Sequence, residues 1–137
     1  MVQLRVEAAD RHRGLFVLAV GGLLVGAAMA VFGLPPLDLH GPLHNLFGIM
    51  DPLCGGTRGV YSAMRGDVAS AWAYNPASIP LVLGALTLVV RHVAGWLTGR
   101  WLTVRLRPRW LVVTVAVVLV VALGVNQQLH ADLLMRP

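Results

Sequence analysis

The sequence has little charge and almost no cysteine. Only 12% of its 137 residues are charged, against roughly a quarter in an ordinary soluble domain, and 57% are hydrophobic. A soluble domain of this size leaves a large share of its surface in water and could not hide so much apolar surface. With one cysteine, Cys54, the chain can form no internal disulfide and no site that needs two cysteines. These deficits favour an integral membrane protein.

Lysine is absent, so all 11 basic residues are arginines, and the formal net charge is +5. Proteins that bind nucleic acid gather their basic residues in one patch or stripe. The arginines here flank apolar blocks instead, which is the pattern of membrane topology. We therefore expect no nucleic-acid partner.

Three apolar blocks are each about 20 residues long, the length at which a helix crosses a ~30 Å hydrocarbon core. Pro35-Pro36 ends the first block, and Asn75 as N-cap with Pro76 in the first turn opens the second. We predict an all-α integral membrane protein of one domain with three transmembrane helices. Its expected segments are a tail 1–14, a span 15–34, an outer loop 35–75 with short amphipathic helices, a span 76–98, a basic loop 99–109, a span 110–130 and a tail 131–137.

The arginines also predict the orientation. Eight of them lie on the side of the tail 1–14 and the loop 99–109, and three lie on the side of the loop 35–75 and the tail 131–137. The eight are Arg5, Arg11, Arg13, Arg91, Arg100, Arg105, Arg107 and Arg109, and the three are Arg58, Arg65 and Arg136. Because arginine-rich loops stay in the cytoplasm, we expect a plasma-membrane protein with a cytoplasmic N-terminus and an outer C-terminus.

Residues 1–30 also fit a cleavable signal peptide, with a basic start, an apolar core and Ala28-Met29-Ala30 as the cleavage site. The apolar run continues beyond that site, however, so we favour a retained first span.

The loop 35–75 carries signals of local order. Gly55-Gly56 predicts a turn, Thr57 the N-cap of a short helix, and Gly66 the end of that helix. Asp67 then predicts the cap of a second short helix, from Val68 to Tyr74.

Part of this loop resembles a known family. The stretch from Asp51 to Arg58 (DPLCGGTR), then Gly66-Asp67 and Asn75-Pro76, is similar to the signature of small bacterial membrane proteins known only as a domain of unknown function. That signature is roughly Cys-Pro-x-Cys-Gly-x-Thr-Arg, then Gly-Asp and Asn-Pro before a membrane helix, and the resemblance covers about residues 50–90. The family's first cysteine is Asp51 here, so this chain cannot use a cysteine pair in the same way. Some actinobacterial proteins of this kind resemble accessory subunits of the cytochrome bcc–cytochrome oxidase supercomplex, so the resemblance implies a respiratory partner.

The chemistry-bearing residues do not form a convincing catalytic set. Possible metal ligands lie in the outer loop, but loop residues of these types are usually solvated or capping, so we expect no metal site. They are Asp38, His40, His44, Asp51 and Cys54. His92 and His130 fall at opposite membrane surfaces and could not ligate one haem, so we expect no cofactor. We interpret Cys54 as a buried thiol, Arg58 as a loop or headgroup anchor and Asp67 as a cap.

The first and third spans contain no ionisable residue, which argues against a transport path. Gly22, Gly26 and Ala30 place small residues on one face of the first span, which suits close contact with another helix. We therefore expect a non-catalytic accessory or assembly subunit, not an enzyme, in a multi-subunit membrane complex. The alternative is a stand-alone membrane sensor or enzyme that uses the His, Cys and Asp residues of the outer loop.

Overall fold

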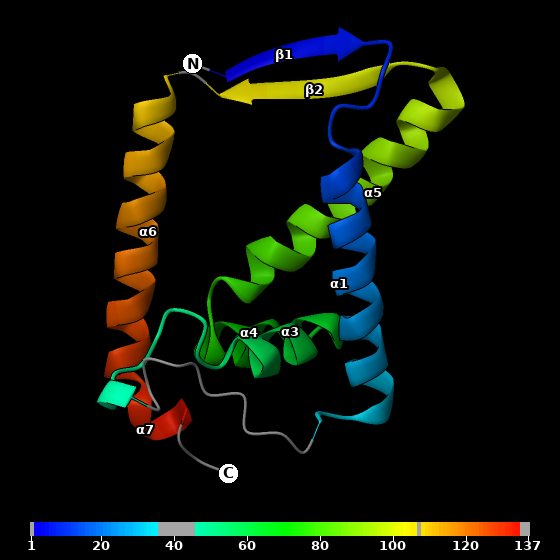
Figure 1. Cartoon of the computed structure of the whole chain (residues 1–137). Helices are drawn as coiled ribbons and strands as arrows, with labels where there is room; N and C mark the ends of the chain where they lie inside the picture. Colours follow the sequence, from blue (N-terminus) through cyan, green and yellow to red (C-terminus); the bar gives the residue numbers. More distant parts are fainter. Residues whose placement is uncertain (1, 36–45, 107, 135–137) are drawn as a thin grey trace.

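The computed structural model describes residues 2–35, 46–106 and 108–134. Three of its helices are long and apolar enough to cross a membrane: α1 (Arg13–Phe32), α5 (Ser78–Thr98) and α6 (Arg109–Leu129). Their ends lie within two residues of the predicted spans. The prediction of a mainly helical protein with three spanning helices is confirmed (Figure 1).

The spanning helices do not form one bundle. α1 and α5 cross and pack against each other, with the ring of Phe16 stacked on the ring of His92. α6 stands apart from both (Figure 1), and the side chains of residues 109–122 are all exposed. Within the described residues, α6 is therefore exposed from Arg109 to Ala122, which is about two thirds of its length.

Two short helices lie across one end of α1 and α5, namely α3 (Gly56–Met64) and α4 (Val68–Tyr74). α3 ends at a left-handed Gly66 (φ +79°), and the N–H groups of Gly66 and Asp67 donate back to carbonyls of α3. Asp67 then caps α4, because its Oδ1 accepts the N–H of Ser70 at 3.0 Å. The end of the first short helix and the cap of the second are as the sequence predicted.

Thr57 does not cap α3, contrary to the prediction. The N-cap residue is Gly55, whose φ of +69° is a conformation that glycine adopts without strain. The preceding turn closes when the Gly56 N–H donates to the carbonyl of Leu53 at 2.9 Å. Thr57 is thus the second residue of α3, and its side chain does not cap the helix.

Two strands were not predicted. β1 (Val2–Glu7) and β2 (Trp101–Leu106) pair as an antiparallel two-stranded ribbon, with Val2 opposite Leu106 and Glu7 opposite Trp101. The predicted tail 1–14 and basic loop 99–109 are therefore not plain connections, because they join each other (Figure 1). The ribbon links the end of α5 to the start of α6.

The predicted tail 131–137 also contains structure. Ala131–Leu134 forms a short helix, α7, directly after α6. Leu134 packs with Met50 and Cys54 in a small buried cluster, against which Tyr74 lies. This cluster connects the far end of α6 to the segment that precedes α3.

Candidate functional site

Asn75 is the centre of a buried polar junction where the turn before α3, the end of α4 and the start of α5 meet. Its side chain is 2% exposed, and its Nδ2 donates to the carbonyls of Pro52 at 3.1 Å and Cys54 at 3.0 Å. Its Oδ1 accepts the N–H of Ala77 at 3.0 Å, and its own carbonyl accepts the Ser78 hydroxyl. One amide therefore fixes the start of α5 to the turn before α3. We call Pro52, Cys54, Asn75, Ala77 and Ser78 the Asn75 junction.

The prediction for Asn75 and Pro76 needs correction. α5 begins at Ser78, so Asn75 precedes the helix by three residues and formally ends α4, while Pro76 lies in the intervening turn. The Asn75 side chain still satisfies one N–H at the entrance to α5, through Ala77. Its two bonds to the carbonyls of the earlier turn could not be read from a capping pattern.

Close packing at the junction depends on two glycines. A Cβ on Gly59 would collide with the Ser78 side chain and lie 3.3 Å from the Cβ of Asn75. A Cβ on Gly55 would lie 2.5 Å from the carbonyl oxygen of Tyr74. The Gly55-Gly56-Thr57-Arg58-Gly59 sequence therefore brings α3 against the start of α5 and the end of α4.

Cys54 is 2% exposed and contributes its carbonyl to the junction, in keeping with a buried structural thiol. Asp51 is 6% exposed, and its Oδ1 accepts the N–H of Leu53 at 3.0 Å, which stabilises the turn. Arg58 lies 5.8 Å above the ring of Tyr74. Asp38, His40 and His44 lie outside the described residues. Within the described residues, no three His, Cys, Asp or Glu side chains gather closely enough to hold a metal ion.

The far end of α6 is attached to this region by two glutamines whose tertiary contacts the sequence did not predict. Gln127 is fully buried, and its Nε2 donates to the carbonyl of Tyr74 at 3.2 Å. Gln128 accepts the N–H of Met50 at 2.9 Å through Oε1. The sequence does contain an indication of these contacts, namely two adjacent amide side chains at the end of an apolar helix. Side-chain amides in such places commonly form hydrogen bonds with backbone groups.

A second cluster lies at the opposite end of α1 and α5. The carboxylate of Asp10 accepts Arg91 Nη1 at 2.9 Å and lies 3.0 Å from His92 Nδ1. Arg91 also donates through Nε to the carbonyl of Leu102 and lies 5.8 Å from the ring of Trp101. We call Asp10, Phe16, Arg91, His92 and Trp101 the Asp10 cluster. It joins the segment after β1 to α1, α5 and β2.

Electrostatics in the Asp10 cluster favour the ionised carboxylate of Asp10. Burial raises the pKa of this carboxyl, but hydrogen bonds from the His12 N–H, Arg91 and His92, together with the charge of Arg91, lower it by more. The pKa of Asp10 therefore lies below its ordinary value of 3.8. The sequence reading placed Arg91 and His92 near a membrane surface but found no partner for them, because Asp10 is 81 residues away from Arg91.

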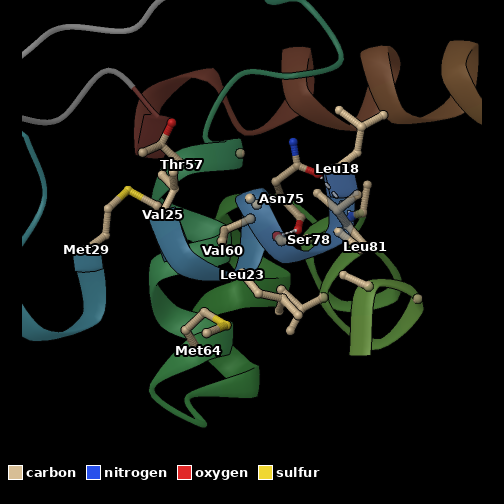
Figure 2. A pocket seen from close by; sticks show the side chains of 18 of the residues that line it. Leu18, Leu23, Val25, Met29, Thr57, Val60, Met64, Asn75, Ser78 and Leu81 are labelled. Carbon is tan, nitrogen blue, oxygen red and sulfur yellow. Dashed lines mark hydrogen bonds between the residues drawn. The ribbon is translucent and has the colours of Figure 1, made fainter. Parts of the chain in front are cut away.

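An apolar groove runs between α1 and α5 and over α3 (Figure 2). Leu18, Val25 and Met29 of α1 line one wall, and Ser78 and Leu81 of α5 line the other. Thr57, Val60 and Met64 of α3 close the end beside the Asn75 junction. The groove has a volume of about 1630 Å³.

The small-residue face of the first span is used in two ways. A Cβ on Gly26 would lie 3.1 Å from Met64 and 3.3 Å from Val60, so α3 packs on this glycine. Gly22 lines the groove, and no atom lies within 4 Å of where its Cβ would be. The carbonyl of Ala30 accepts Arg65 Nη1 at 3.4 Å. Part of the face thus receives a short helix of the same chain, and part stays open.

Comparison with known proteins gives a match that covers the segment that builds the Asn75 junction. No curated protein and no solved structure matches the chain. A family model does match part of it, in agreement with the resemblance in the loop and the start of the following helix. Residues 42–89, which include α3, α4 and the first half of α5, match the model of a family described as protein of unknown function, DUF2752.

Proposed function

We propose that this chain is a non-catalytic accessory or assembly subunit of a multi-subunit membrane complex. The observation that carries the proposal is the isolation of α6. This helix is exposed over residues 109–122 and meets the rest of the chain at its two ends (Figure 1). A helix held at both ends and open between them offers a long surface to a spanning helix of another subunit.

The residues exposed on α6 suit such contacts. They are mainly valine and leucine, with Val113, Val117 and Val121 each more than half exposed. Lipid tails are as apolar as these side chains, so helices in a membrane associate through close packing and not through the hydrophobic effect. Stiff β-branched side chains lose little freedom on packing, which favours a specific partner.

The more specific proposal is that the partner belongs to the respiratory chain. It rests on the sequence resemblance to proteins of the cytochrome bcc–cytochrome oxidase supercomplex. That assembly is therefore the first in which to look for the chain.

The test is photo-crosslinking followed by mild-detergent purification. A photoreactive amino acid is placed in turn at Val117, Val118, Leu119 and Val120, because successive helix residues point about 100° apart and together sample every side of α6. We expect a strong adduct with one membrane subunit at one or two of these positions, identified by mass spectrometry. Asp132, exposed on α7, is the control position and should give no such adduct.

Deleting the chain should then weaken the association or stability of that complex and leave its redox centres intact. A monomeric chain without adducts at any of the four positions contradicts the proposal. A purified chain that carries metal and acts alone would favour the alternative, a sensor or enzyme.

A further inference from the structure

The groove between α1 and α5 has two walls over only about half the length of α5. On α1 its lining extends from Leu15 to Phe32, nearly the whole helix. On α5 it extends only from Ser78 to Leu88, and none of the residues from Val89 to Thr98 take part. Eleven helical residues span about 15 Å, which is half of a ~30 Å hydrocarbon core. The two-walled part of the groove therefore corresponds to one leaflet, on the α3 side.

This length distinguishes between possible occupants. A spanning helix of another protein needs contact surface across both leaflets, whereas an acyl chain occupies one leaflet only. The walls are aliphatic and include Gly22 and Gly84, where a Cβ would meet no atom within 4 Å. The groove is thus shaped for a flexible hydrocarbon chain that enters from the leaflet on the α3 side.

Polar groups stand at the end of the groove where a lipid headgroup would lie. Thr57 lines this end, and its hydroxyl makes no hydrogen bond with any residue that the structure describes. Asn75 and Ser78 line it too, but their polar atoms are engaged within the junction. A hydroxyl in this place can donate to an ester or phosphate oxygen.

A positive charge lies just beyond the groove, at Arg65, the residue that follows the lining residue Met64. Arg65 is exposed and is held by its Nη1, which donates to Tyr61 Oη at 3.0 Å and to the carbonyl of Ala30 at 3.4 Å. No carboxylate of the described ranges forms an ion pair with Arg65, and the nearby Asp67 is engaged as the cap of α4. The remaining N–H groups of Arg65 can therefore bind an anion, since guanidinium groups match phosphate geometry.

We propose that the groove between α1 and α5 binds an anionic phospholipid of the leaflet on the α3 side, with an acyl chain along the groove, its phosphate at Arg65 and an ester oxygen at Thr57. This binding site goes beyond the subunit role and does not depend on it, because it lies on α1, α3 and α5 and not on α6. The lipid would fill the open part of the small-residue face, next to Gly22.

The first test measures lipid binding by native mass spectrometry. The detergent-purified full chain is titrated with palmitoyl-oleoyl phosphatidylglycerol or with the zwitterionic phosphatidylcholine of the same chains. We expect the anionic lipid to bind about tenfold more tightly, and Arg65→Gln to remove this preference. Arg100→Gln is the control, because Arg100 is exposed at the opposite end of α5. Equal binding of both lipids by the wild-type chain overturns the proposal.

The second test fills the groove. Ala28 lines it, whereas the neighbouring Ala27 is exposed on α1 and does not. Ala28→Leu should weaken binding of both lipids several-fold, and Ala27→Leu should leave binding unchanged. Gly84→Leu provides a second filled groove, because open space surrounds that position. Equal binding by the Ala27 and Ala28 variants excludes the groove as the site.

The third test identifies the occupant in the native membrane. A photoreactive amino acid at Leu81, which lines the groove, should yield adducts with lipid. A protein adduct at Leu81 would show that a partner subunit fills the groove and would overturn the proposal. Because α6 carries the crosslinking positions of the proposed function, the two hypotheses can fail independently.

Discussion

Replacing Asn75 by alanine should cost about 3 kcal/mol of unfolding free energy. The change removes three side-chain hydrogen bonds, to the carbonyls of Pro52 and Cys54 and from the N–H of Ala77. Each is worth roughly 0.5–1.5 kcal/mol, so the three together are worth roughly 1.5–4.5 kcal/mol, and about 3 kcal/mol is the middle of that range. A loss of this size raises the unfolding equilibrium constant by about a hundredfold.

The assay is reversible unfolding of the purified chain in mixed micelles, with helix content followed by circular dichroism as the SDS fraction rises. Asn126→Ala is the matched control, because its side-chain amide makes no hydrogen bond within the described part of the chain. Asn75→Asp keeps the acceptor for the Ala77 N–H, but it places a carboxylate oxygen against the carbonyl oxygens of Pro52 and Cys54. Because these oxygens repel one another, Asn75→Asp should destabilise the chain at least as much as Asn75→Ala. A cost for Asn75→Ala no greater than that for Asn126→Ala would refute the reasoning.

Three further perturbations test other parts of the structure. Gly59→Ala should destabilise the chain by about 1–3 kcal/mol in the same assay, because the new methyl group meets Ser78, and Ser78→Gly should restore part of the loss. Asp10→Asn should increase amide exchange in β1 at neutral pH. Since the folded-state pKa of Asp10 is lowered, the contribution of its carboxylate is present above pH 3.8 and disappears as the pH falls through the folded-state value, so wild type and variant should converge in acid. Single cysteines at Arg100 and Asp132, both exposed, should report topology with an impermeant thiol reagent; labelling of position 100 from outside, without labelling of 132, contradicts the predicted orientation.

The spanning helices and α4 could be predicted because their signals are local. A run of about 20 apolar residues has few alternatives to a membrane helix. The limits of α4 follow from two residues, Asp67 and Asn75, whose side chains satisfy backbone groups at its start and just after its end. Such signals depend on neighbours a few residues away and need no knowledge of the tertiary structure.

The ribbon of β1 and β2 was missed although its signal is in the sequence. Val2, Leu4 and Val6 alternate with polar residues, and Leu102 and Val104 do the same in the partner strand. The arginines of these segments fit a marker of topology equally well, and nothing local links strands that lie more than 90 residues apart.

The arrangement of the helices, and therefore the groove, could not be predicted from the sequence. Whether α6 packs on α1 and α5 depends on small differences in packing, because lipid competes equally for its valines. Gly26 illustrates the point: the sequence showed a small-residue face, but the atoms nearest to a Cβ at Gly26 belong to Val60 and Met64 of the short helix α3 and not to a spanning helix. The Asp10 cluster likewise joins Asp10 to Arg91 and His92, which follow it by about 80 positions.

The pairing of β1 with β2 has a consequence for biogenesis. β1 leaves the ribosome first, yet its partner ends only at Leu106, after two spanning helices have been made. At a synthesis rate of about 5–20 residues per second, β1 waits on the order of 5–20 s with an unpaired edge. An exposed strand edge in the cell is open to wrong pairing, and the arginine at its centre, Arg5, is the kind of residue that discourages it. Ribbon closure is thus a late step, because the two strands can meet only after α1 and α5 have both been made and have returned the chain to the side of the membrane where β1 lies.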